Sequence, residues 1–452
     1  MSRPQRFTAS GLCLAGLLWA AGAASQPLTV DRAVAIALEK NSQIINAVAG
    51  VLDANGNVYG AYGGVLPHVS ANWSRSATQN VQGRGSQIVS TVVISAPPTD
   101  NVSYAMGPAL TGSWSILDLA NLKALGAARS GLKASKLSQQ AARTAVAFNT
   151  RQQFYLTASA YHLAWVSDVA LRLARDNERR VRALFEVGSV SKSDLLSAQV
   201  QTSNSQLDSL TAHQAIVNQR IALAEVLAMK ESQLGDVDTV LTAEPQEYNE
   251  PDLLAEAQRN RPDLLAAEAN LSAAHSSVTS AKFLRLPYVT LSGSAQFNPQ
   301  RTFNQKQFPP ALAPVETSGR SDADRVLSGT LAVNWDLFLG GSTESRIASA
   351  RAALLRAEDS RDALRRNLEA EIHQALLQYR EATERLNVAN SAFASAVENL
   401  KLTQQKYNVG STTILDLNTA QVNLTRAAAD RVSAQAGIRT AEAQLIRVRG
   451  RE

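Results

Sequence analysis

The chain has 452 residues, only 5% of them aromatic, and a formal net charge of +5. Few aromatic side chains and many alanines and serines favour closely packed long helices over thick globular cores. Without Arg3 and Arg6 of the expected leader the net charge is about +3, which is too weak to indicate binding to nucleic acid.

Residues 1–25 are expected to be an export signal. Arg3 and Arg6 precede an apolar stretch at 11–21 that is too short for a membrane anchor, and small residues at 21–25 provide a cleavage site. Cys13, the only cysteine, follows Leu12, where lipidation would need a small residue. The exported chain is therefore predicted to carry neither a lipid nor a disulfide.

A helix is predicted over 28–62, beginning at a cap from Thr29 or Asp31, with apolar residues at helical spacing. Its counterpart in the second half of the chain covers 252–283. Both segments lead to a Leu-Pro pair, at 66–67 and 286–287. Proline stops a helix and is tolerated at the start of a strand, so a strand is expected after each pair.

Four strands are predicted from alternation with a period of two, two in each half. Polar loops are expected between them, at 78–102 and 298–324. One face of the strands is polar and the other is apolar, and the apolar face is predicted to face lipid. Its aromatic residues are Trp73, Tyr104, Trp114, Phe297 and Trp335.

This alternation is typical of the wall of a membrane β-barrel, although a soluble sandwich alternates as well. Two short hairpins in an otherwise helical chain cannot build a sandwich with its own core. Four strands cannot close a membrane barrel either, because unpaired edges are not tolerated in lipid. Several chains must therefore share one barrel, and three chains would give twelve strands.

Two long helical hairpins are predicted, because 132–187 and 342–409 contain neither glycine nor proline. The second run would span about 100 Å at 1.5 Å per residue. The returning helices are expected at 191–234 and 412–436, packed as antiparallel coiled coils.

The two hairpin tips are copies of one sequence, LFEVGSVSKSDLLSAQ at 184–199 and KYNVGSTTILDLNTAQ at 406–421. Gly188 and Gly410 are expected to close the first helix of each hairpin in the left-handed conformation. The copies indicate an internal duplication, with one repeat at 26–240, a connector at 241–251 and a second repeat at 252–452.

No pattern in the sequence indicates catalysis, a cofactor or a metal. The five histidines are scattered without metal-ligand spacing. No glycine-rich phosphate loop, nucleophile elbow or paired-carboxylate motif is present. An enzyme is therefore not expected.

The export signal, the duplicated halves, the Leu-Pro pairs, the W-x-L-F-x-G-G motif at 335–341 and the [FY]-x-V-G-S tips together resemble the TolC-type outer-membrane efflux proteins. The resemblance covers essentially all of the exported chain. It implies a homotrimer in outer-membrane lipid, with a twelve-stranded barrel and a long periplasmic tunnel of twelve helices. It also implies the exit duct of a tripartite efflux or type I secretion system, beside a periplasmic adaptor and an inner-membrane transporter.

The resemblance further implies a gate at the tunnel entrance. Family closure uses a tyrosine near the tip and acidic residues at the constriction, and Tyr407 and Asp416 match those positions. Where the family has an arginine and a second acid, this chain has Thr412 and Thr419. The gate would then rely on Asp416, Tyr407 and hydroxyls rather than on a full ionic lock.

Each of these residues also has a structural interpretation. Asp416 forms a ring of three acids in a trimer, or it is an acid favoured by the helix dipole. Asp194 fits the second role better, and Tyr407 is a gate residue or a packing residue. The tips are expected to be turns that also present the adaptor-docking surface. Their residues are Val187, Gly188, Ser189, Val409, Gly410 and Ser411.

The function expected from the sequence is a passive exit duct for small toxic compounds or polypeptides. The alternative is an exported coiled-coil scaffold or adhesin without a pore. That alternative accounts for the helices and the export signal, but it leaves the duplicated aromatic strands without a role.

Overall fold

The computed structural model describes residues 27–82, 85–89, 92–96, 99–242, 246–298, 300–305, 319–320 and 324–452. The expected export signal with Cys13 and residues 243–245 of the expected connector lie outside them. The chain divides into two compact units. The helical unit contains the residues up to Gly50, Leu137–Leu265 and Ala363–Glu452, and the sheet unit contains Val51–Lys136 and Ala266–Asp362.

Each half of the chain begins with two shorter helices rather than the single helix predicted from periodicity. α1 covers Val30–Lys40 and α2 Ser42–Gly63, and α5 covers Glu250–Asn260 and α6 Pro262–Phe283. Thr29 caps α1, as expected. Asn41 is extended, its amide donates to the Val226 carbonyl at 2.9 Å, and its Oδ1 accepts from the Gln43 N–H at 2.9 Å. This side chain ends one helix and caps the next, a break that apolar periodicity does not report.

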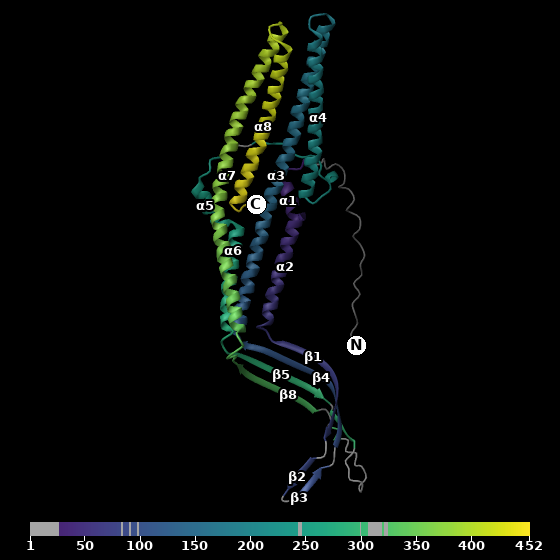
Figure 1. Cartoon of the computed structure of the whole chain (residues 1–452), viewed down its shortest axis with the longest axis vertical. Helices are drawn as coiled ribbons and strands as arrows, with labels where there is room; N and C mark the ends of the chain where they lie inside the picture. The colour runs from purple at the N-terminus through teal and green to yellow at the C-terminus, as the bar shows by residue number, and fades with distance from the viewer. Residues whose placement is uncertain are drawn as a thin grey trace, which may run out of the picture. The chain divides into compact units, whose positions relative to one another are not determined.

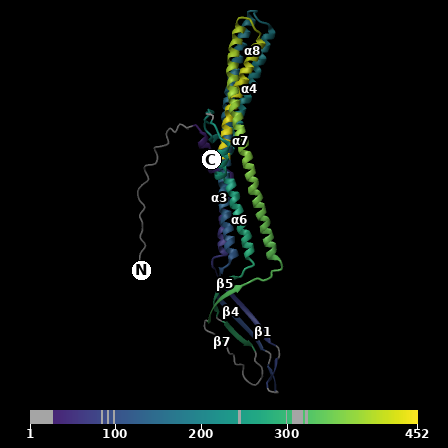
Figure 2. The same cartoon turned by 90° about the vertical axis from the view of Figure 1, so that its left-hand side faces the viewer.

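Two long helical hairpins follow, α3 (Leu119–Glu186) with α4 (Lys192–Val226), and α7 (Ser342–Asn408) with α8 (Ile414–Val448). In the helical unit they run side by side and turn at the same end (Figures 1 and 2). α3 begins earlier than expected and α8 ends later. Gly126, Gly131 and Gly437 lie inside these helices, where packing outweighs the cost of about 1 kcal/mol for a helical glycine. α4 ends earlier than expected, at Val226.

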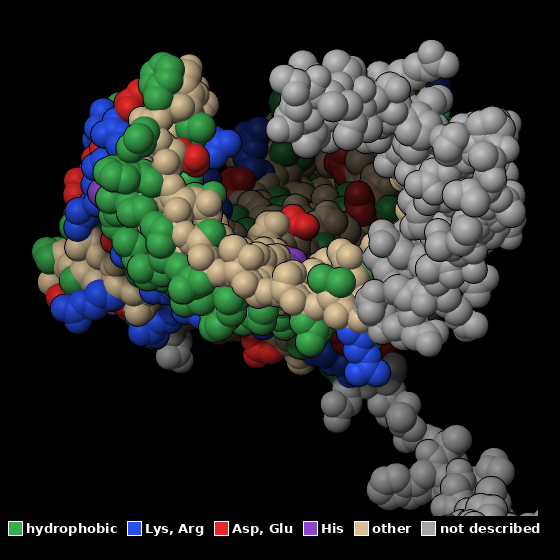
Figure 3. All heavy atoms as spheres, turned by 90° about the horizontal axis from the view of Figure 1, so that it is seen from below, with side chains coloured by type: hydrophobic (Ala, Val, Ile, Leu, Met, Phe, Trp, Pro, Cys, Tyr) green, Lys and Arg blue, Asp and Glu red, His purple; other side chains and the backbone are tan. Residues whose placement is uncertain are grey.

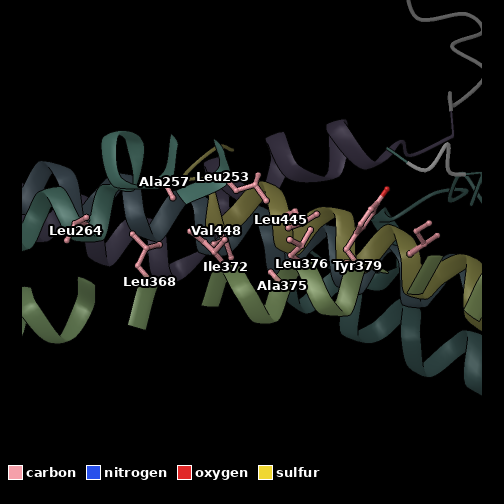
Figure 4. Packing of buried hydrophobic residues seen from close by; sticks show 12 residues of the cluster. Leu253, Ala257, Leu264, Leu368, Ile372, Ala375, Leu376, Tyr379, Leu445 and Val448 are labelled. Carbon is pink, nitrogen blue, oxygen red and sulfur yellow. The ribbon is translucent and has the colours of Figure 1, made fainter. Parts of the chain in front are cut away.

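The second hairpin and α5–α6 share a buried core in the helical unit (Figure 4). Leu368, Ile372 and Leu376 of α7 lie one helical turn apart and are each 2% exposed. Burying each such side chain contributes about 1.5–3 kcal/mol. An equivalent cluster joins α1 to the first hairpin, with Leu223 and Leu227 fully buried.

The sheet unit contains four long antiparallel strands in the order β1–β4–β5–β8. They cover His68–Gln82, Thr99–Leu117, Tyr288–Asn298 and Asp324–Asn334. The shorter strands are β2 (Gly85–Val89), β3 (Val92–Ala96), β6 (Gln300–Gln305) and β7 (Gly319–Arg320). The prediction of loops at 78–102 and 298–324 was therefore wrong in part. β1 and β4 stay paired to Gln82 and Thr99, because a backbone ladder continues whatever the polarity of its side chains.

The register places apolar side chains on one face of this sheet and hydroxyl or amide side chains on the other. In Figure 3 a hydrophobic band follows the outer side of the sheet, and polar side chains follow the inner side. Trp73 pairs with Pro108 and Trp114 with Leu291 on the apolar face. Trp73, Trp114, Phe297 and Trp335 are all exposed, whereas the side chain of Tyr104 lies outside the described part.

Two tryptophans fix the junction between helix and strand in a matching way. The Trp114 indole donates to the Val65 carbonyl at 2.8 Å, and the Trp335 indole donates to the Arg285 carbonyl at 3.0 Å. Each acceptor precedes the Leu-Pro pair of its own half. An apolar ring with one polar N–H suits a site that is apolar at one end and polar at the other. None of the helices in the described ranges is apolar enough over a sufficient length to span a bilayer.

Candidate functional site

The two hairpin tips have the same backbone geometry. Gly188 and Gly410 both have φ of +76°, as the sequence predicts. After each glycine a serine N–H returns to the helix, Ser189 to the Leu184 carbonyl at 2.8 Å and Ser411 to the Lys406 carbonyl at 2.9 Å. This pattern satisfies the last carbonyls of a helix and needs a residue that tolerates positive φ. The duplicated V-G-S sequence therefore forms the same turn twice.

A capping box begins the returning helix at each tip. Ser191 and Asp194 form it at α4, and Thr413 and Asp416 form it at α8. In each box the N-cap hydroxyl accepts the N–H of the acid, and the carboxylate accepts the N–H of the N-cap residue. Both acids thus have a structural role that the sequence interpretation gave only as helix-dipole stabilisation.

Asp416 is bound more tightly than Asp194. Its Oδ2 accepts from the hydroxyls of Thr412 at 2.7 Å and Thr413 at 2.8 Å, and from the Thr413 N–H at 3.1 Å. These hydrogen bonds lower the pKa of Asp416 below its ordinary value, and the bond from Thr412 has the largest effect. The side chain is exposed, so the second tip presents to solvent a carboxylate that is ionised at neutral pH.

The side chain of Tyr407 packs against other side chains and is not fully exposed to solvent. Its ring belongs to a cluster at the tips in which Val181, Ala198, Ile414 and Leu417 are buried. Its hydroxyl is buried, with no hydrogen-bond partner among the residues that the structure describes. Burial raises the pKa of Tyr407, the charge of Asp194 raises it further, and Arg180 opposes both. The structure therefore places Tyr407 against the first hairpin and joins it by no hydrogen bond to Asp416.

The two threonines that the resemblance assigns to the gate differ in their surroundings. Thr412 contributes its hydroxyl to Asp416. Thr419 is exposed, and its hydroxyl donates to the Leu415 carbonyl of its own helix at 2.8 Å. Asp416 and Thr412 thus form one hydrogen-bonded group, and Thr419 stands outside it.

A buried polar pair near the tips was not found from the sequence. The Asn177 amide of α3 donates to Oδ1 of Asn418 on α8 at 3.3 Å, and the two residues are 3% and 9% exposed. The pair joins the two hairpins in the core, where buried amides need a partner. Asparagines at core positions of both helices were the available signal, but a single sequence does not show which helices meet.

The expected docking residues lie on the surface. Val187 and Val409 are 74% and 78% exposed, and both tip glycines and serines are exposed too. Within the described residues no cluster of His, Cys, Asp and Glu is suited to hold a metal ion. The tips therefore present two exposed valines among polar residues, together with the exposed carboxylate of Asp416, a surface suited to contacts with another protein.

A family model described as outer membrane efflux protein matches residues 253–451. The chain is similar to outer membrane protein TolC of Vibrio cholerae, with 27% identity over 234 residues, 52% of this chain and 51% of that protein. It is also similar to TolC of Escherichia coli, with 22% identity over 329 residues, 71% of this chain and 64% of that protein. The matches span about half and just under two thirds of these relatives.

The fold is similar to the crystal structure of the outer membrane protein VceC from Vibrio cholerae. The TM-score is 0.75 at 19% identity, over 93% of this chain and 96% of that one. This likeness confirms the predicted fold class, long helical hairpins with four long strands in each chain.

Proposed function

The chain belongs to the TolC-type outer membrane efflux proteins, and on that premise we propose that it forms the channel through which an efflux or secretion system crosses the outer membrane. Family membership makes it an outer-membrane protein. The proposed duct is passive, because transport through a tunnel needs no chemistry from its wall. It would export small toxic compounds or polypeptides.

The main support for this proposal is that the two outer strands of the sheet each have one edge without a partner strand among the described residues. Among the described residues, β1 pairs only with β4, and β8 pairs only with β5. Open edges in lipid leave unsatisfied N–H and C=O groups, each of which costs several kcal/mol. β1 of one copy would therefore pair with β8 of the next. Three copies of β1, β4, β5 and β8 would close a barrel of twelve strands.

An exposed apolar stripe on α4 supports the same assembly. Its residues repeat at the a and d spacing of a coiled coil, interrupted only by the exposed Ser203 and Gln214. The face of α4 that is buried within the chain uses small residues instead, such as Ala198, Ser205 and Ser209. The six members of the stripe are between 46% and 64% exposed: Leu196, Val200, Leu207, Leu210, Val217 and Ile221.

A helix of a neighbouring copy is the partner that this stripe fits. α7 exposes apolar residues of its own, Leu377, Val388 and Leu402, at intervals that keep them on one face. Pairing of α4 with α7 of the next copy would close a ring of helices in the same trimer as the barrel. The proposed periplasmic tunnel is that ring.

The tips would form the entrance of this tunnel. Three copies of Asp416 would then form a ring of ionised carboxylates that favours cations. Tyr407 would act by packing the second hairpin against the first. The exposed turns at Val187 and Val409 would dock a periplasmic adaptor, which connects the duct to an inner-membrane transporter.

Purified protein in detergent tests this proposal directly. We expect a trimer by light scattering corrected for detergent, and ion conduction after reconstitution into planar bilayers. A monomer that stays soluble without detergent would instead support the exported scaffold or adhesin. Co-purification of an adaptor and a transporter from cross-linked cells would identify the kind of system served.

A further inference from the structure

The polar face of the sheet is lined mainly by hydroxyl groups. The Ser70 and Thr111 hydroxyls are 2.6 Å apart, those of Ser294 and Ser328 are 2.8 Å apart, and the Asn334 amide donates to the Thr290 hydroxyl at 3.1 Å. These contacts join facing strands along the register. A shallow hollow on this face is lined by side chains of one kind, apart from one imidazole: His68, Ser70, Thr111, Ser113, Ser292, Ser294, Ser328 and Thr330.

No charged side chain interrupts this lining where the side chains are described. The strand register places every second residue on this face. These are the even-numbered residues of 68–78, 290–296 and 326–334 and the odd-numbered residues of 107–115. None of these residues is Asp, Glu, Lys or Arg. The arginines of these strands lie on the opposite face, where Arg75 pairs with Met106 and Arg325 with Phe297.

His68 contributes the imidazole of this lining, and imidazole is the side-chain group that can change its charge between pH 5 and pH 8. It is the first residue of β1, it is exposed, and it lies opposite Ser113 of β4. Its Nε2 is 3.9 Å from the point where a Cβ on Gly63 would stand, so the imidazole lies beside the end of α2. The imidazole therefore sits at the helical end of the strand.

Two ionisable side chains nearby are hydrogen-bonded, Tyr62 at the end of α2 and Asp118 just before α3. The Tyr62 hydroxyl accepts from Arg129 at 2.6 Å. The Asp118 carboxylate accepts from the N–H and the amide of Asn121 at 3.0 and 2.8 Å. On the facing strands, Ser113, Ser292 and Thr330 are uncharged. Asp118 and Arg129 keep their charges in these bonds, and the exposed Asp336 follows β8 at the same end of the sheet. His68 is nevertheless the one described side chain on the hydroxyl face of the strands that can become positively charged.

We infer that His68 is a selectivity-determining residue of the barrel, the group whose charge sets the ion preference of an otherwise neutral hydroxyl wall. The inference rests on the proposed function, because it needs the polar face to enclose the pore of a trimer. Three imidazolium groups then attract anions at acidic pH. At alkaline pH the hydroxyl face carries no such charge, and the cation preference of the proposed Asp416 ring is unopposed. The effect depends on salt, because dissolved ions screen an exposed charge. The screening length is about 30 Å at 0.01 M and about 3 Å at 1 M.

Reversal potentials in planar bilayers test this inference. At salt on the order of 10 mM, the wild-type chloride-to-potassium permeability ratio is expected to be about twofold or more higher at pH 5 than at pH 8, and the difference should vanish near 1 M. His68→Gln should remove the pH difference, and His68→Lys should fix the acidic preference at both pH values. His275→Gln, on the exposed surface of α6, is the matched control and should behave as wild type.

The outcomes separate the two proposals. A conducting trimer whose pH difference survives His68→Gln would overturn the role of His68 and leave the duct intact. A protein that neither trimerises nor conducts would overturn the duct itself.

Thiol labelling checks the geometry without relying on selectivity. In a background with Cys13 replaced, which removes the only native cysteine, His68→Cys should react with a charged, water-soluble methanethiosulfonate in proteoliposomes. Val69→Cys, exposed on the apolar face next to it, should react only with a membrane-permeant maleimide. Equal labelling of both positions by the charged reagent would contradict the assignment of the two faces.

Discussion

Asp416 combines two roles at a single carboxylate. It closes a capping box at the start of α8, and it carries an exposed charge whose pKa is lowered by hydrogen bonds from Thr412 and Thr413. Because both functions use the same oxygen atoms, replacing the residue by alanine would remove a cap worth about 1 kcal/mol together with the charge. An informative variant must separate the two.

Asp416→Asn keeps an acceptor oxygen for the cap and removes the charge. We expect the cation preference of the channel to fall, because the proposed ring of three acids loses its field. Single-channel reversal potentials measure this. Asp194→Asn at the first tip makes the same change in a matching capping box and should leave selectivity unchanged. Equal effects of the two variants would remove Asp416 from the entrance.

A substitution at Tyr407 distinguishes a packing role from a role in the gate. Its buried hydroxyl lacks a hydrogen-bond partner in the described part of the chain, and a buried polar group without a partner costs about 1–3 kcal/mol. Tyr407→Phe should therefore keep or raise the melting temperature in detergent. A lower melting temperature would mean that the assembled protein supplies a partner for the hydroxyl, as a gate residue would require.

Three glycines of the hairpins differ in whether their backbone conformation requires glycine. Gly188 and Gly410 adopt positive φ in open turns, whereas Gly437 lies inside α8 with nothing within 4 Å of an added Cβ. The tip glycines are therefore needed for their backbone conformation, and Gly437 is not.

Gly410→Ala should destabilise the protein by about 1–2 kcal/mol, the cost of a left-handed L-residue. Gly437→Ala should stabilise it by about 0.5–1 kcal/mol, because alanine is the better helix former. Thermal unfolding of both variants in detergent measures the contrast. Loss of stability in both would show that α8 has a close neighbour at Gly437 in the assembled protein.

The end of α8 is tied to α5 by ion pairs of Glu256. Its Oε2 accepts from Arg449 at 2.8 Å, and its Oε1 lies 2.5 Å from Arg451. Burial by itself raises the pKa of Glu256, but the bonds and charges of Arg449 and Arg451 outweigh it and lower the pKa. A lowered folded-state pKa stabilises the fold above the unfolded value, and this contribution is lost as pH falls through the folded value.

Glu256→Gln should therefore lower the melting temperature at pH 7 and change it little near pH 3, since the window lies below the ordinary pKa of 4.5. Thermal unfolding at the two pH values provides the measurement. Glu381→Gln removes an exposed pair with Arg385, 64% and 70% exposed, and should have little effect at either pH. A loss at pH 3 as large as that at pH 7 would contradict the role of the ion pair.

At the scale of the whole molecule, the α4 stripe is the most accessible test of assembly. Leu207→Glu with Leu210→Glu places two charges at the centre of the proposed contact between copies. Both side chains are more than 60% exposed within one chain, so the fold of the single chain should tolerate them. We expect the trimer to dissociate in detergent, as measured by light scattering.

Asp208→Lys, on the same turn but outside the stripe, is the control for this experiment and should stay trimeric. A trimer that survives the double change would show that α4 does not form the contact between copies.

Sequence reasoning was most accurate where local chemistry decides the structure. V-G-S with a following Ser or Thr and an Asp three residues later specifies a left-handed turn and a capping box. Strict alternation at 288–297 specifies a strand with one polar face. It was least accurate at helix boundaries. Asn41 interrupts a helically periodic segment and hydrogen-bonds to Val226, 185 residues away. Gly131 lies inside α3, which its neighbours stabilise despite the glycine.

By itself the sequence determined the duplication, the V-G-S turns, the strand faces and the resemblance to an outer-membrane duct, because each depends on residues close together in the chain or on a repeated order of motifs. Only the tertiary structure decided that Tyr407 packs against the first hairpin, that Asn177 meets Asn418, and that α4 exposes a stripe of apolar residues. These facts depend on which helices meet and in which register, and both are settled by packing between segments hundreds of residues apart. Within one chain the same packing leaves the sheet edges unpaired and the α4 stripe exposed, and these are the surfaces at which we propose that copies of the chain meet.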